Sequence, residues 1–502
     1  MSVLTPGDTC WRRARADRAA FLIDTEAYFT AVFEALRKAR RSVILLGWGF
    51  DPRTRLSPDG QETPDDPDEV GRILIELAQA RPDLDIRLLI WRSALPIAAS
   101  QEFFPHRARK WFEGTPVKFV LDDQVPFGAC HHQKVLVVDD AVAFCGGGDI
   151  SVDRWDTAAH LDVDQRRIMP DHECHAPRHE VMMMVDGPAA QALGDLARER
   201  WRRATGETID PPPSTAASAD PWPSHVPAHL IDADIAIART EPAWHGREEV
   251  DEIRRLTQAS IMSARQTIYL ENQYFTSPLV AEALASRLAE PDGPEVVLIS
   301  TGRSPSWFDQ LTMDRARSNM LWRLRAADIF GRFRAYYPTT PRGAKIIVHA
   351  KSSVFDDRIV RIGSANINNR SGGFDTECEL AVEADGEMAR RAIGTFRDRS
   401  IGHFLGYTGD AVARARAEMG GLIPAIDHLN REGRLTPILP MKLTAFGEFI
   451  AACHVGDPVN PADSWRLGRR RERLYAEARA LGVGGMFRSR NWKTPLRRGP
   501  EA

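Results

Sequence analysis

The sequence predicts an α/β protein built from two similar halves, and three observations lead to this prediction. Short apolar runs typical of strands alternate with segments whose apolar residues have helical spacing. A Pro-, Ser- and Thr-rich stretch interrupts this pattern near the middle of the chain, and a similar pattern restarts after it. Alternating strands and helices favour a sheet covered by helices, and the restart indicates a duplication.

Length and composition are those of a folded globular protein. The chain has 502 residues, of which 43% are hydrophobic and 27% charged, and these are ordinary globular values. They exclude a disordered or collagen-like chain, and six cysteines without paired spacing exclude a disulfide framework. The formal net charge of −3 excludes a protein that coats nucleic acid by overall positive charge.

The first half is expected over residues 25–204, behind a short leader of residues 1–24. A helix is expected at 25–40, because Phe29, Val32 and Leu36 share one helical face. The other expected elements are a helix at 68–80 and strands at 43–47, 85–91, 117–121, 134–138 and 142–145. These strands are apolar runs bounded by Asp and Gly turns.

Residues 205–228 are expected to be a linker, because Pro, Ser, Thr and Ala dominate this stretch. The second half is expected over 229–410, with helices at 248–264 and 308–327 and strands at 267–271 and 296–300. From 411 to 502 helical patterns dominate without a new set of strands, so a helical, basic C-terminal tail is expected.

The strongest feature is a repeated motif, His-x-Lys-x4-Asp, near the end of each half. Its members are His132, Lys134 and Asp139 in the first half and His349, Lys351 and Asp356 in the second. A Gly-containing segment follows each copy, and Asp149 and Asn366 both lie 17 residues after the motif histidine. One copy could arise by chance, whereas two copies with matched downstream spacing identify an internal repeat.

The motif residues suit phosphodiester chemistry. In a strand, residues two apart point to the same face, so each histidine projects together with its lysine. Two such pairs create a pocket in which the ammonium groups stabilise the charge of a phosphodiester. One neutral imidazole attacks phosphorus while the other, protonated, donates to the leaving oxygen. This chemistry requires no metal and no other cofactor, and none is expected.

Several segments resemble the phospholipase D superfamily, and the resemblance covers approximately residues 25–410. They are HHQK at 131–134, YLENQYF at 269–275, GSANINNRS at 363–371, GWGFD at 47–51 and RWDT at 154–157. These segments are similar to the phosphatidylcholine-hydrolysing, eukaryotic-type branch. The resemblance implies a bilobal α/β fold in which two sandwich halves share one active site. It also implies that His132 attacks phosphorus to form a phosphohistidine and that His349 is the general acid, although the reverse order stays open.

Each catalytic histidine needs an acidic partner on its far nitrogen, and the resemblance supplies two candidates. Glu377 in the Asp375-Thr-Glu377 segment is expected for the second half, and Glu180 for the first. The assignment of Glu180 departs from the family pattern, because Arg178 stands where relatives carry Trp and Glu180 where they carry Asp.

Further site residues are expected around the phosphate. Asn366 and Ser371 match polar residues near the phosphate in the family, and Asp149 is expected in a supporting role. Asp139 and Asp356 are expected to hold the local fold rather than touch substrate. Glu271 and Asn272 either contact substrate or shape the wall of the site.

A metal site is a weaker alternative. His172, Cys174, His175 and His179 lie close together in the sequence. Their spacing matches no standard ligand set, so a surface loop is expected and no metal is assigned.

The leading functional hypothesis is a phospholipase D acting on phospholipid at a membrane surface, as a monomer, with water or a primary alcohol as acceptor. The alternatives are a nuclease, a cardiolipin-synthase-like phosphatidyltransferase and a non-catalytic lipid-binding protein. A nuclease is disfavoured because both motifs lie on one chain with lipid-branch segments, so no nucleic acid partner is expected. A cardiolipin-synthase-like enzyme would be expected to carry N-terminal membrane spans.

The sequence shows no recognisable signal peptide, and its longest apolar run, 43–50, is too short to span a membrane. A soluble, cytoplasmic or peripheral membrane protein is expected. Residues 466–502 contain eleven Lys and Arg against three Asp and Glu. This segment either binds an anionic surface or is an ordinary solvated terminus.

Overall fold

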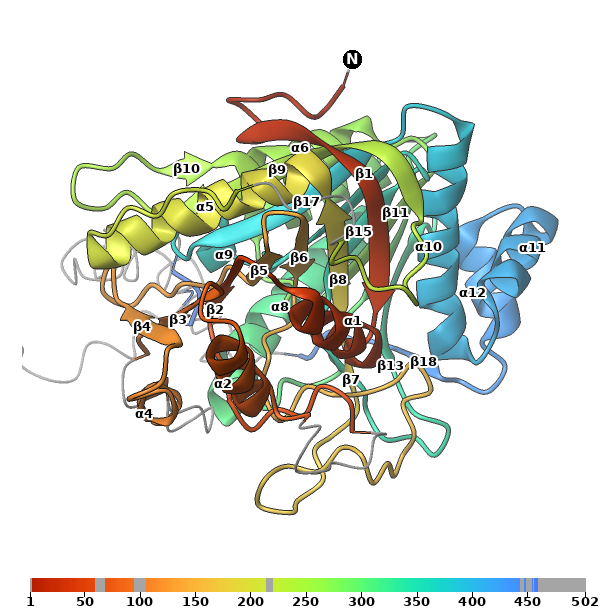
Figure 1. Cartoon of the computed structure of the whole chain (residues 1–502). Helices are drawn as coiled ribbons and strands as arrows, with labels where there is room; N and C mark the ends of the chain where they lie inside the picture. The colour runs from red at the N-terminus through yellow and green to blue at the C-terminus, as the bar shows by residue number, and fades with distance from the viewer. Residues whose placement is uncertain are drawn as a thin grey trace, which may run out of the picture.

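The structure is a computed structural model that describes residues 2–58, 68–93, 105–213 and 220–442, together with 447, 454 and 456–458. Figure 1 follows the chain from its red N-terminal strand to the blue helices near residue 420. The predicted tail segment 466–502 lies outside the described residues. No helix in the described part of the chain is long and apolar enough to cross a membrane.

The two halves are built from matching series of elements. The first half contains β1 (Arg12–Ile23), α1 (Thr25–Lys38), β2 (Ser42–Gly47), α2 (Val70–Ala80), β3 (Asp85–Trp91), α4 (Pro105–Trp111), β4 (Lys118–Asp122), β5 (Val135–Val138), β6 (Val142–Gly146), β7 (Arg178–His179), β8 (Val181–Asp186) and α5 (Gly187–Thr205). The second half contains β9 (Leu230–Glu241), β10 (Val250–Asp251), α6 (Glu252–Ser263), β11 (Thr267–Asn272), α7 (Pro278–Leu288), β12 (Glu295–Ile299), α8 (Trp307–Ala327), β13 (Phe333–Pro338), β14 (Ile347–Val348), β15 (Lys351–Phe355), β16 (Ile359–Gly363), α9 (Asn369–Gly373), β17 (Glu377–Glu383) and α10 (Glu387–Leu405). After these come α11 (Gly409–Met419), α12 (Leu422–Leu429) and β18 (Leu435–Pro437).

In the described part of the chain one sixteen-stranded sheet joins the halves, in the order β18-β13-β12-β11-β15-β16-β17-β9-β1-β8-β6-β5-β2-β3-β4, with β10 beside β9. The order on one side of the β9–β1 pair repeats in reverse on the other side, as expected for two copies related by an approximate two-fold axis. In each half three strands are parallel and the inner strands are antiparallel. The predicted duplicated α/β fold is confirmed.

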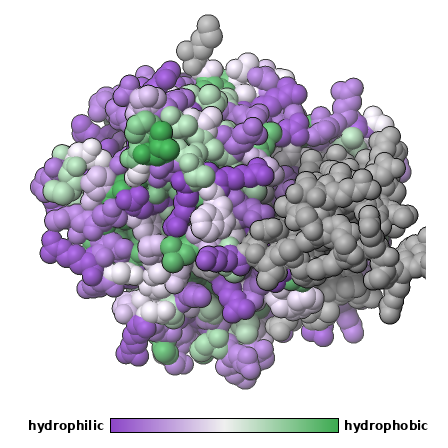
Figure 2. Space-filling model, turned by 180° about the vertical axis from the view of Figure 1, so that it is seen from behind, coloured by the Kyte–Doolittle hydropathy of each residue, from purple (hydrophilic) through white to green (hydrophobic). Residues whose placement is uncertain are grey.

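Helices cover both faces of this sheet. Along β1, Ala19 and Phe21 face a core shared with α5 and α10, while Ala20 and Leu22 face a second core formed with α1 and α2. This alternation is the two-residue period of a strand buried on both faces. The outer face seen in Figure 2 is mostly hydrophilic, with small hydrophobic patches between. Apolar burial is therefore concentrated between the sheet and its helices.

The region expected to be a leader contains the central strand β1, which pairs with both β8 and β9. Its sequence, RRARADRAAFLI, does not predict a strand, because the buried positions at its start are alanines, which have low strand propensity. The arginines between them form ion pairs, including Arg12 with Asp195 at 2.9 Å and Arg18 with Asp186 at 2.6 Å. An alternating Arg/Ala pattern therefore forms a strand here through tertiary pairing.

Residues beyond 410 also differ from the expected helical tail. Leu422, Ile426 and Leu435 are buried in the main core, and β18 extends the sheet by pairing antiparallel with β13. Helices α10, α11 and α12 lie side by side at one edge of the molecule (Figure 1). Residues 411–437 therefore belong to the folded unit rather than to a tail.

The two motif aspartates have the same structural role in both halves. The Asp139 carboxylate accepts hydrogen bonds from the backbone N–H groups of residues 40, 41 and 42 at 2.7, 2.7 and 2.8 Å. Asp356 accepts equivalent bonds from residues 265, 266 and 267. Each carboxylate therefore fixes the loop that enters β2 or β11.

Candidate active site

Two short backbone pairings bring the halves together at the motif histidines. His131 forms a parallel bridge with Thr376, and β14 pairs in parallel with β7. Within these pairings the His132 N–H donates to the Thr376 carbonyl at 3.0 Å, and the His349 N–H donates to the His179 carbonyl at 2.8 Å. These bonds place His132 beside Glu377, the residue after Thr376. They place His349 beside Glu180, the residue after His179.

Those following residues are the two candidate acids. His132 Nδ1 lies 2.9 Å from Glu377 Oε2, and His349 Nδ1 lies 2.7 Å from Glu180 Oε1. The expectation that each acid serves the histidine of its own half is wrong, because the backbone pairing crosses between the halves. A carboxylate at Nδ1 favours the Nδ1–H tautomer and leaves Nε2 available to a substrate.

Glu377 is fully buried and held by two hydroxyl groups. The Ser371 Oγ donates to it at 2.6 Å, and the Ser364 Oγ donates to its other oxygen. Burial raises the pKa of Glu377 to about 7, against the lowering effect of these hydroxyls and of Lys134 and Lys351. This carboxylate therefore changes charge near neutral pH.

Glu180 has a different environment although it occupies the equivalent place. Gly147 stands where the second half has Ser364, and a Cβ on Gly147 would lie 3.0 Å from Glu180 Oε2. Arg154 stands where the second half has Ser371, and its charge interacts with Glu180. Among the described residues, Glu180 receives no hydroxyl hydrogen bond. The two halves therefore support their carboxylates differently.

The two lysines are buried beside the histidines. Lys134 Nζ donates to the His132 carbonyl at 3.0 Å and lies 3.2 Å from Asp149 Oδ2. Lys351 Nζ lies 3.1 Å from His349 Nδ1. Burial lowers the pKa of Lys351 to about 7, and the positive charge of Lys134 acts in the same direction. The site thus concentrates positive charge where an anionic phosphodiester can balance it.

The pKa values of both motif histidines are lowered well below the usual range, and this favours their neutral forms. Burial is the largest cause that lowers the pKa of His132 and of His349, and the neighbouring lysines lower it further. The His132 and His349 side chains retain 15% and 9% of their exposure, so solvent still reaches them. An anionic substrate between them would raise both pKa values, which suits a pair that must share one proton.

The remaining expected site residues have supporting positions. Asp149 accepts from the backbone N–H groups of residues 48 and 49 while it pairs with Lys134, so it orients that lysine. Asn366 lines a cavity beside Lys351, and its Oδ1 is buried without a hydrogen-bond partner among the described residues. Asn272 bonds the backbone of residues 365 and 367, so its geometry favours the role in the site wall.

Glu271 points away from the histidine–lysine pairs. It accepts from the Tyr269 hydroxyl at 2.6 Å and the Ser352 hydroxyl at 2.7 Å, and lies 3.2 Å from His179 Nε2. Of the histidines considered for a metal, His172 is exposed, whereas His179 is fully buried. The surface-loop prediction is therefore wrong for His179, because the chain turns inward at β7.

Two of the larger cavities lined by described residues reach the site. One, of about 350 Å³, has mostly apolar walls that include Leu270, Leu279 and Phe355, and it contacts Lys351. The other, of about 720 Å³, contacts His349 and has polar walls. The site therefore opens on one side to an apolar space and on the other to a polar one.

Sequence reasoning missed Arg154, Ser364 and Gln273 around the site. Arg154 lines the polar cavity, Ser364 supports Glu377, and Gln273 Oε1 lies 3.4 Å from Lys351 Nζ. Ser364 and Gln273 lie inside the GSAN and ENQYF segments already singled out. Arg154 was detectable because it follows Asp149 at the interval that separates Asn366 from Ser371.

Comparisons with known proteins agree with this geometry. Residues 35–279 match the phospholipase D family, and residues 258–399 match the cardiolipin synthase, PLD-like domain. The chain is 23% identical to phospholipase D2 of Bos taurus, over 74% of this chain and 50% of that protein. It is 22% identical to phospholipase D1 of Saccharomyces cerevisiae, over 72% of this chain and 26% of that protein. The chain thus matches half or less of the length of these relatives.

A solved structure shares the fold. The phosphatidylserine synthase of Haemophilus influenzae Rd KW20 superposes with a TM-score of 0.52 and 11% sequence identity. The superposition covers 94% of this chain and 96% of that protein. At this identity the likeness shows the duplicated fold alone.

Proposed function

We propose that this chain, which belongs to the phospholipase D superfamily, hydrolyses phosphatidylcholine-type phospholipids to phosphatidic acid and the free headgroup. One observation carries the proposal. His132 Nδ1 is hydrogen-bonded to the buried Glu377 of the opposite half, His349 Nδ1 lies 2.7 Å from the buried Glu180 of the opposite half, and a buried lysine lies beside each histidine. This arrangement leaves two imidazole Nε2 atoms and two ammonium groups for one phosphodiester.

In the first step, the neutral His132 Nε2 attacks phosphorus, and a bond forms between nitrogen and phosphorus. The bond from phosphorus to the headgroup oxygen breaks, and His349 donates its proton to that oxygen. Glu377 stabilises the positive charge that develops on His132. Lys134 and Lys351 stabilise the negative charge that develops on the phosphoryl oxygens.

In the second step, His349 accepts a proton from water while the water oxygen attacks phosphorus. The nitrogen–phosphorus bond breaks, phosphatidic acid leaves and His132 returns to its neutral form. A primary alcohol in place of water yields a phosphatidyl alcohol by the same route. The roles of the two histidines are exchangeable in this scheme, and mass-spectrometric mapping of a trapped phosphohistidine distinguishes the two orders.

The cavities support a lipid substrate. The apolar cavity beside Lys351 suits part of a diacylglycerol moiety, because its walls are mainly hydrophobic. The polar cavity beside His349 includes Tyr274 and Asp309, and an aromatic ring with a carboxylate suits a quaternary ammonium headgroup. A headgroup on the His349 side agrees with His349 as the group that protonates the leaving oxygen.

The proposal also includes the surrounding surface and the oligomeric state. A membrane surface supplies the substrate, and the positive charge of residues 466–502 suits an anionic surface. Deleting 466–502 is expected to weaken adsorption to anionic vesicles, most clearly at low salt; unchanged adsorption would contradict this role. A monomer is expected because one chain supplies both motif copies.

One alternative has a specific observation in its favour. The match of residues 258–399 to the cardiolipin synthase, PLD-like domain favours phosphatidyl transfer to an alcohol over hydrolysis. Both reactions use the same phosphohistidine, so they differ only in the acceptor of the second step.

The deciding experiment is incubation with phosphatidylcholine vesicles, with and without 1-butanol. Release of choline with phosphatidic acid is the expected result, and phosphatidylbutanol is expected when butanol is present. Transfer without hydrolysis would favour the phosphatidyltransferase. Cleavage of DNA with no turnover of phospholipid would overturn the proposal, and binding without any cleavage would identify a lipid-binding protein.

A further inference from the structure

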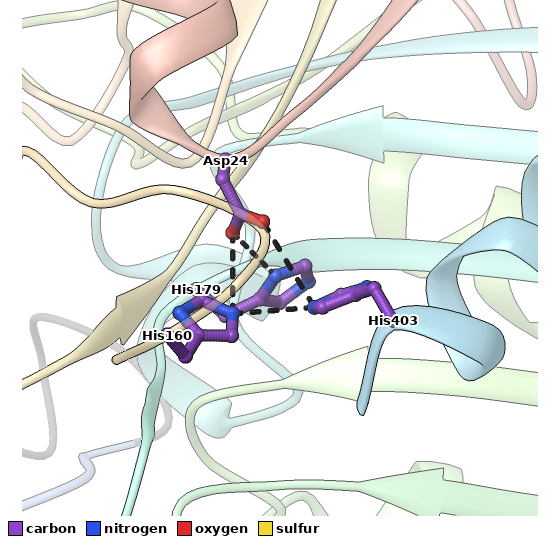
Figure 3. Close-up of side chains that lie close together, drawn as sticks. All are labelled: Asp24, His160, His179 and His403. Atoms are coloured by element: carbon purple, nitrogen blue, oxygen red, sulfur yellow. Dashed lines mark hydrogen bonds and ion pairs between the residues drawn. The ribbon is translucent and has the colours of Figure 1, made fainter. Parts of the chain in front are cut away.

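We propose that Asp24, His160, His179 and His403 form a buried site for one divalent transition-metal ion, with zinc as its ion. The four side chains converge from four segments of the chain (Figure 3). Asp24 follows β1, His160 lies in the loop after β6, His179 belongs to β7, and His403 lies near the end of α10. The site lies outside the histidine–lysine pairs and is separate from the proposed lipid reaction.

The distances between the candidate ligand atoms lie around those of a small four-coordinate site. His179 Nδ1 lies 2.7 Å from Asp24 Oδ1, and His160 Nε2 lies 3.7 Å from the same oxygen. His403 Nε2 lies 3.2 Å from His160 Nε2 and 3.9 Å from Asp24 Oδ2. Tetrahedral zinc with ligands at about 2.0–2.1 Å separates neighbouring ligand atoms by about 3.3 Å. The observed separations lie on both sides of this value.

The far nitrogens of two histidines are held as they are in metal centres. His160 Nδ1 lies 2.8 Å from Asp156 Oδ2, and His179 Nε2 lies 3.2 Å from Glu271 Oε2. A carboxylate on the far nitrogen fixes the tautomer and increases the basicity of the nitrogen that faces the ion. This accounts for Glu271, whose position the proposed lipid reaction does not explain.

Two further features of the cluster are also explained by an ion. Asp24 Oδ2 is buried and has no hydrogen-bond partner among the described residues. The carboxylate to which this oxygen belongs lies near all three imidazoles. The Nε2 atoms of His160 and His403 face each other, and only one of them can carry the proton of a hydrogen bond between them. A cation accepts lone pairs from all of these atoms at once.

The donor set indicates the class of ion. Three imidazole nitrogens and one carboxylate oxygen suit zinc and other first-row transition metals better than calcium or magnesium, which prefer oxygen ligands. Asp24, His160 and His179 are 0–1% exposed and the His403 side chain is 10% exposed. Four protein ligands in a buried site are typical of structural rather than catalytic zinc.

The ion would also stabilise the backbone that positions Glu180 and His349. The Asp24 N–H donates to the Glu180 carbonyl at 2.8 Å, and the His179 carbonyl accepts from the His349 N–H. The ligands also join β1 and β7 of the first half to α10 of the second. The ion would therefore fix the segment that carries Glu180 and, through it, the position of His349.

The test measures metal directly on the full chain. Protein purified from zinc-supplemented cells is expected to retain about one zinc ion per chain by mass spectrometry of the metal content. Removal of zinc with a strong chelator is expected to lower the Tm, and added zinc is expected to restore it. Cobalt added to the zinc-free chain is expected to give the intense visible absorption of a tetrahedral site.

Two variants assign the ion to this cluster. His403→Gln changes the most exposed ligand and is expected to remove the cobalt absorption and lower zinc affinity at least about tenfold. His172→Gln is the matched control, because His172 is exposed and outside the cluster. If His403→Gln fails to fold, the zinc content, the chelator response and the cobalt spectrum of the unaltered chain still decide the question.

Substoichiometric zinc, a Tm indifferent to chelator and no cobalt absorption would together overturn the proposal. The cluster would then be a metal-free network in which a protonated His179 lies between Asp24 and Glu271. An unchanged cobalt spectrum in His403→Gln would also contradict it. None of these measurements depends on lipid turnover, so they succeed or fail separately from the proposed phospholipase activity.

Discussion

Replacing Glu377 by Gln tests the crossed pairing of acids and histidines. The amide keeps the shape and can still accept from His132 Nδ1–H, but it removes the negative charge 2.9 Å from that nitrogen. A hydrogen bond to a charged group contributes about 1.5–3 kcal/mol, and about 1.4 kcal/mol corresponds to a tenfold change in rate. Because the amide can keep a neutral hydrogen bond of about 0.5–1.5 kcal/mol, the charge alone contributes about 1–1.5 kcal/mol, which corresponds to a loss of about 5- to 13-fold in kcat.

Loss of tautomer control adds to this effect. The amide introduced by Glu377→Gln can turn its NH2 group toward His132, and this favours the tautomer that carries its proton on Nε2, where it blocks attack on phosphorus. In a Ser-His-Asp triad the corresponding change lowers kcat by about 10⁴, so the total expected for Glu377→Gln is about 10²–10⁴. Choline release from saturating vesicles measures kcat, and rapid quenching measures formation of the phosphohistidine.

The control variant is Glu383→Gln, because Glu383 lies on the same strand, β17, as Glu377. Glu383→Gln lies at the far end of β17, bonds Arg358 and Ser2, and is expected to leave kcat near that of the unaltered chain. If Glu377→Gln retains kcat within about threefold, the charge at His132 Nδ1 contributes less than about 0.7 kcal/mol. The proposed role of the crossed carboxylate would then be wrong.

Three further predictions follow from the site and its support. His132→Ala and His349→Ala are each expected to lower kcat by several orders of magnitude, because both act on one displacement; near-normal choline release by either variant would rule out the two-histidine mechanism. The pH profile of kcat/KM, which reports groups of the free enzyme, is expected to be a narrow bell centred near 7. Activity rises as Glu377, with a pKa of about 7, loses its proton, and falls as Lys351, with a pKa of about 7, loses its positive charge. Glu377→Gln is expected to remove the rising limb, and a rising limb that persists would assign it to another group. Asp139→Ala leaves three backbone N–H groups without their acceptor and is expected to lower the free energy of unfolding by about 2–4 kcal/mol; urea denaturation measures this, and an unchanged midpoint would contradict it.

Local patterns in the sequence were sufficient to predict much of the fold. The helix at Thr25–Lys38 and the strands Asp85–Trp91 and Thr267–Asn272 agree with the predicted ranges within about two residues, because apolar periodicity is strong there. The central strand Arg12–Ile23 was not predicted because the buried residues in its first nine positions are alanines and the residues between them are charged. Such a strand is specified by its two neighbours in the sheet, and its own sequence carries little information about them.

The candidate site was predictable in its residue types but not in its partnerships. The spacing of His132 and Lys134 on one strand is local, so their juxtaposition follows from the period of a strand. The pairing of His132 with Glu377 joins residues 245 positions apart and depends on a short parallel bridge between the halves. Nothing in either half distinguishes its own acid from that of the other half until the two-fold arrangement is known.

The duplication explains why the backbone of the site is similar in the two halves. The side chains around the two carboxylates nevertheless differ. Equivalent backbone pairings hold His132 and His349, yet two hydroxyls surround Glu377 while Gly147 and Arg154 take their places beside Glu180. In the proposed reaction the two histidines perform different tasks, because one bonds phosphorus and the other carries the proton. A strictly symmetric pair would leave each histidine equally suited to both tasks. Because the residues around the two carboxylates differ, we expect them to decide which histidine bonds phosphorus. Exchange of Ser364 and Ser371 with Gly147 and Arg154 is expected to move the phosphohistidine to the other half, and mass-spectrometric mapping of the trapped intermediate would show an unchanged site if this expectation is wrong.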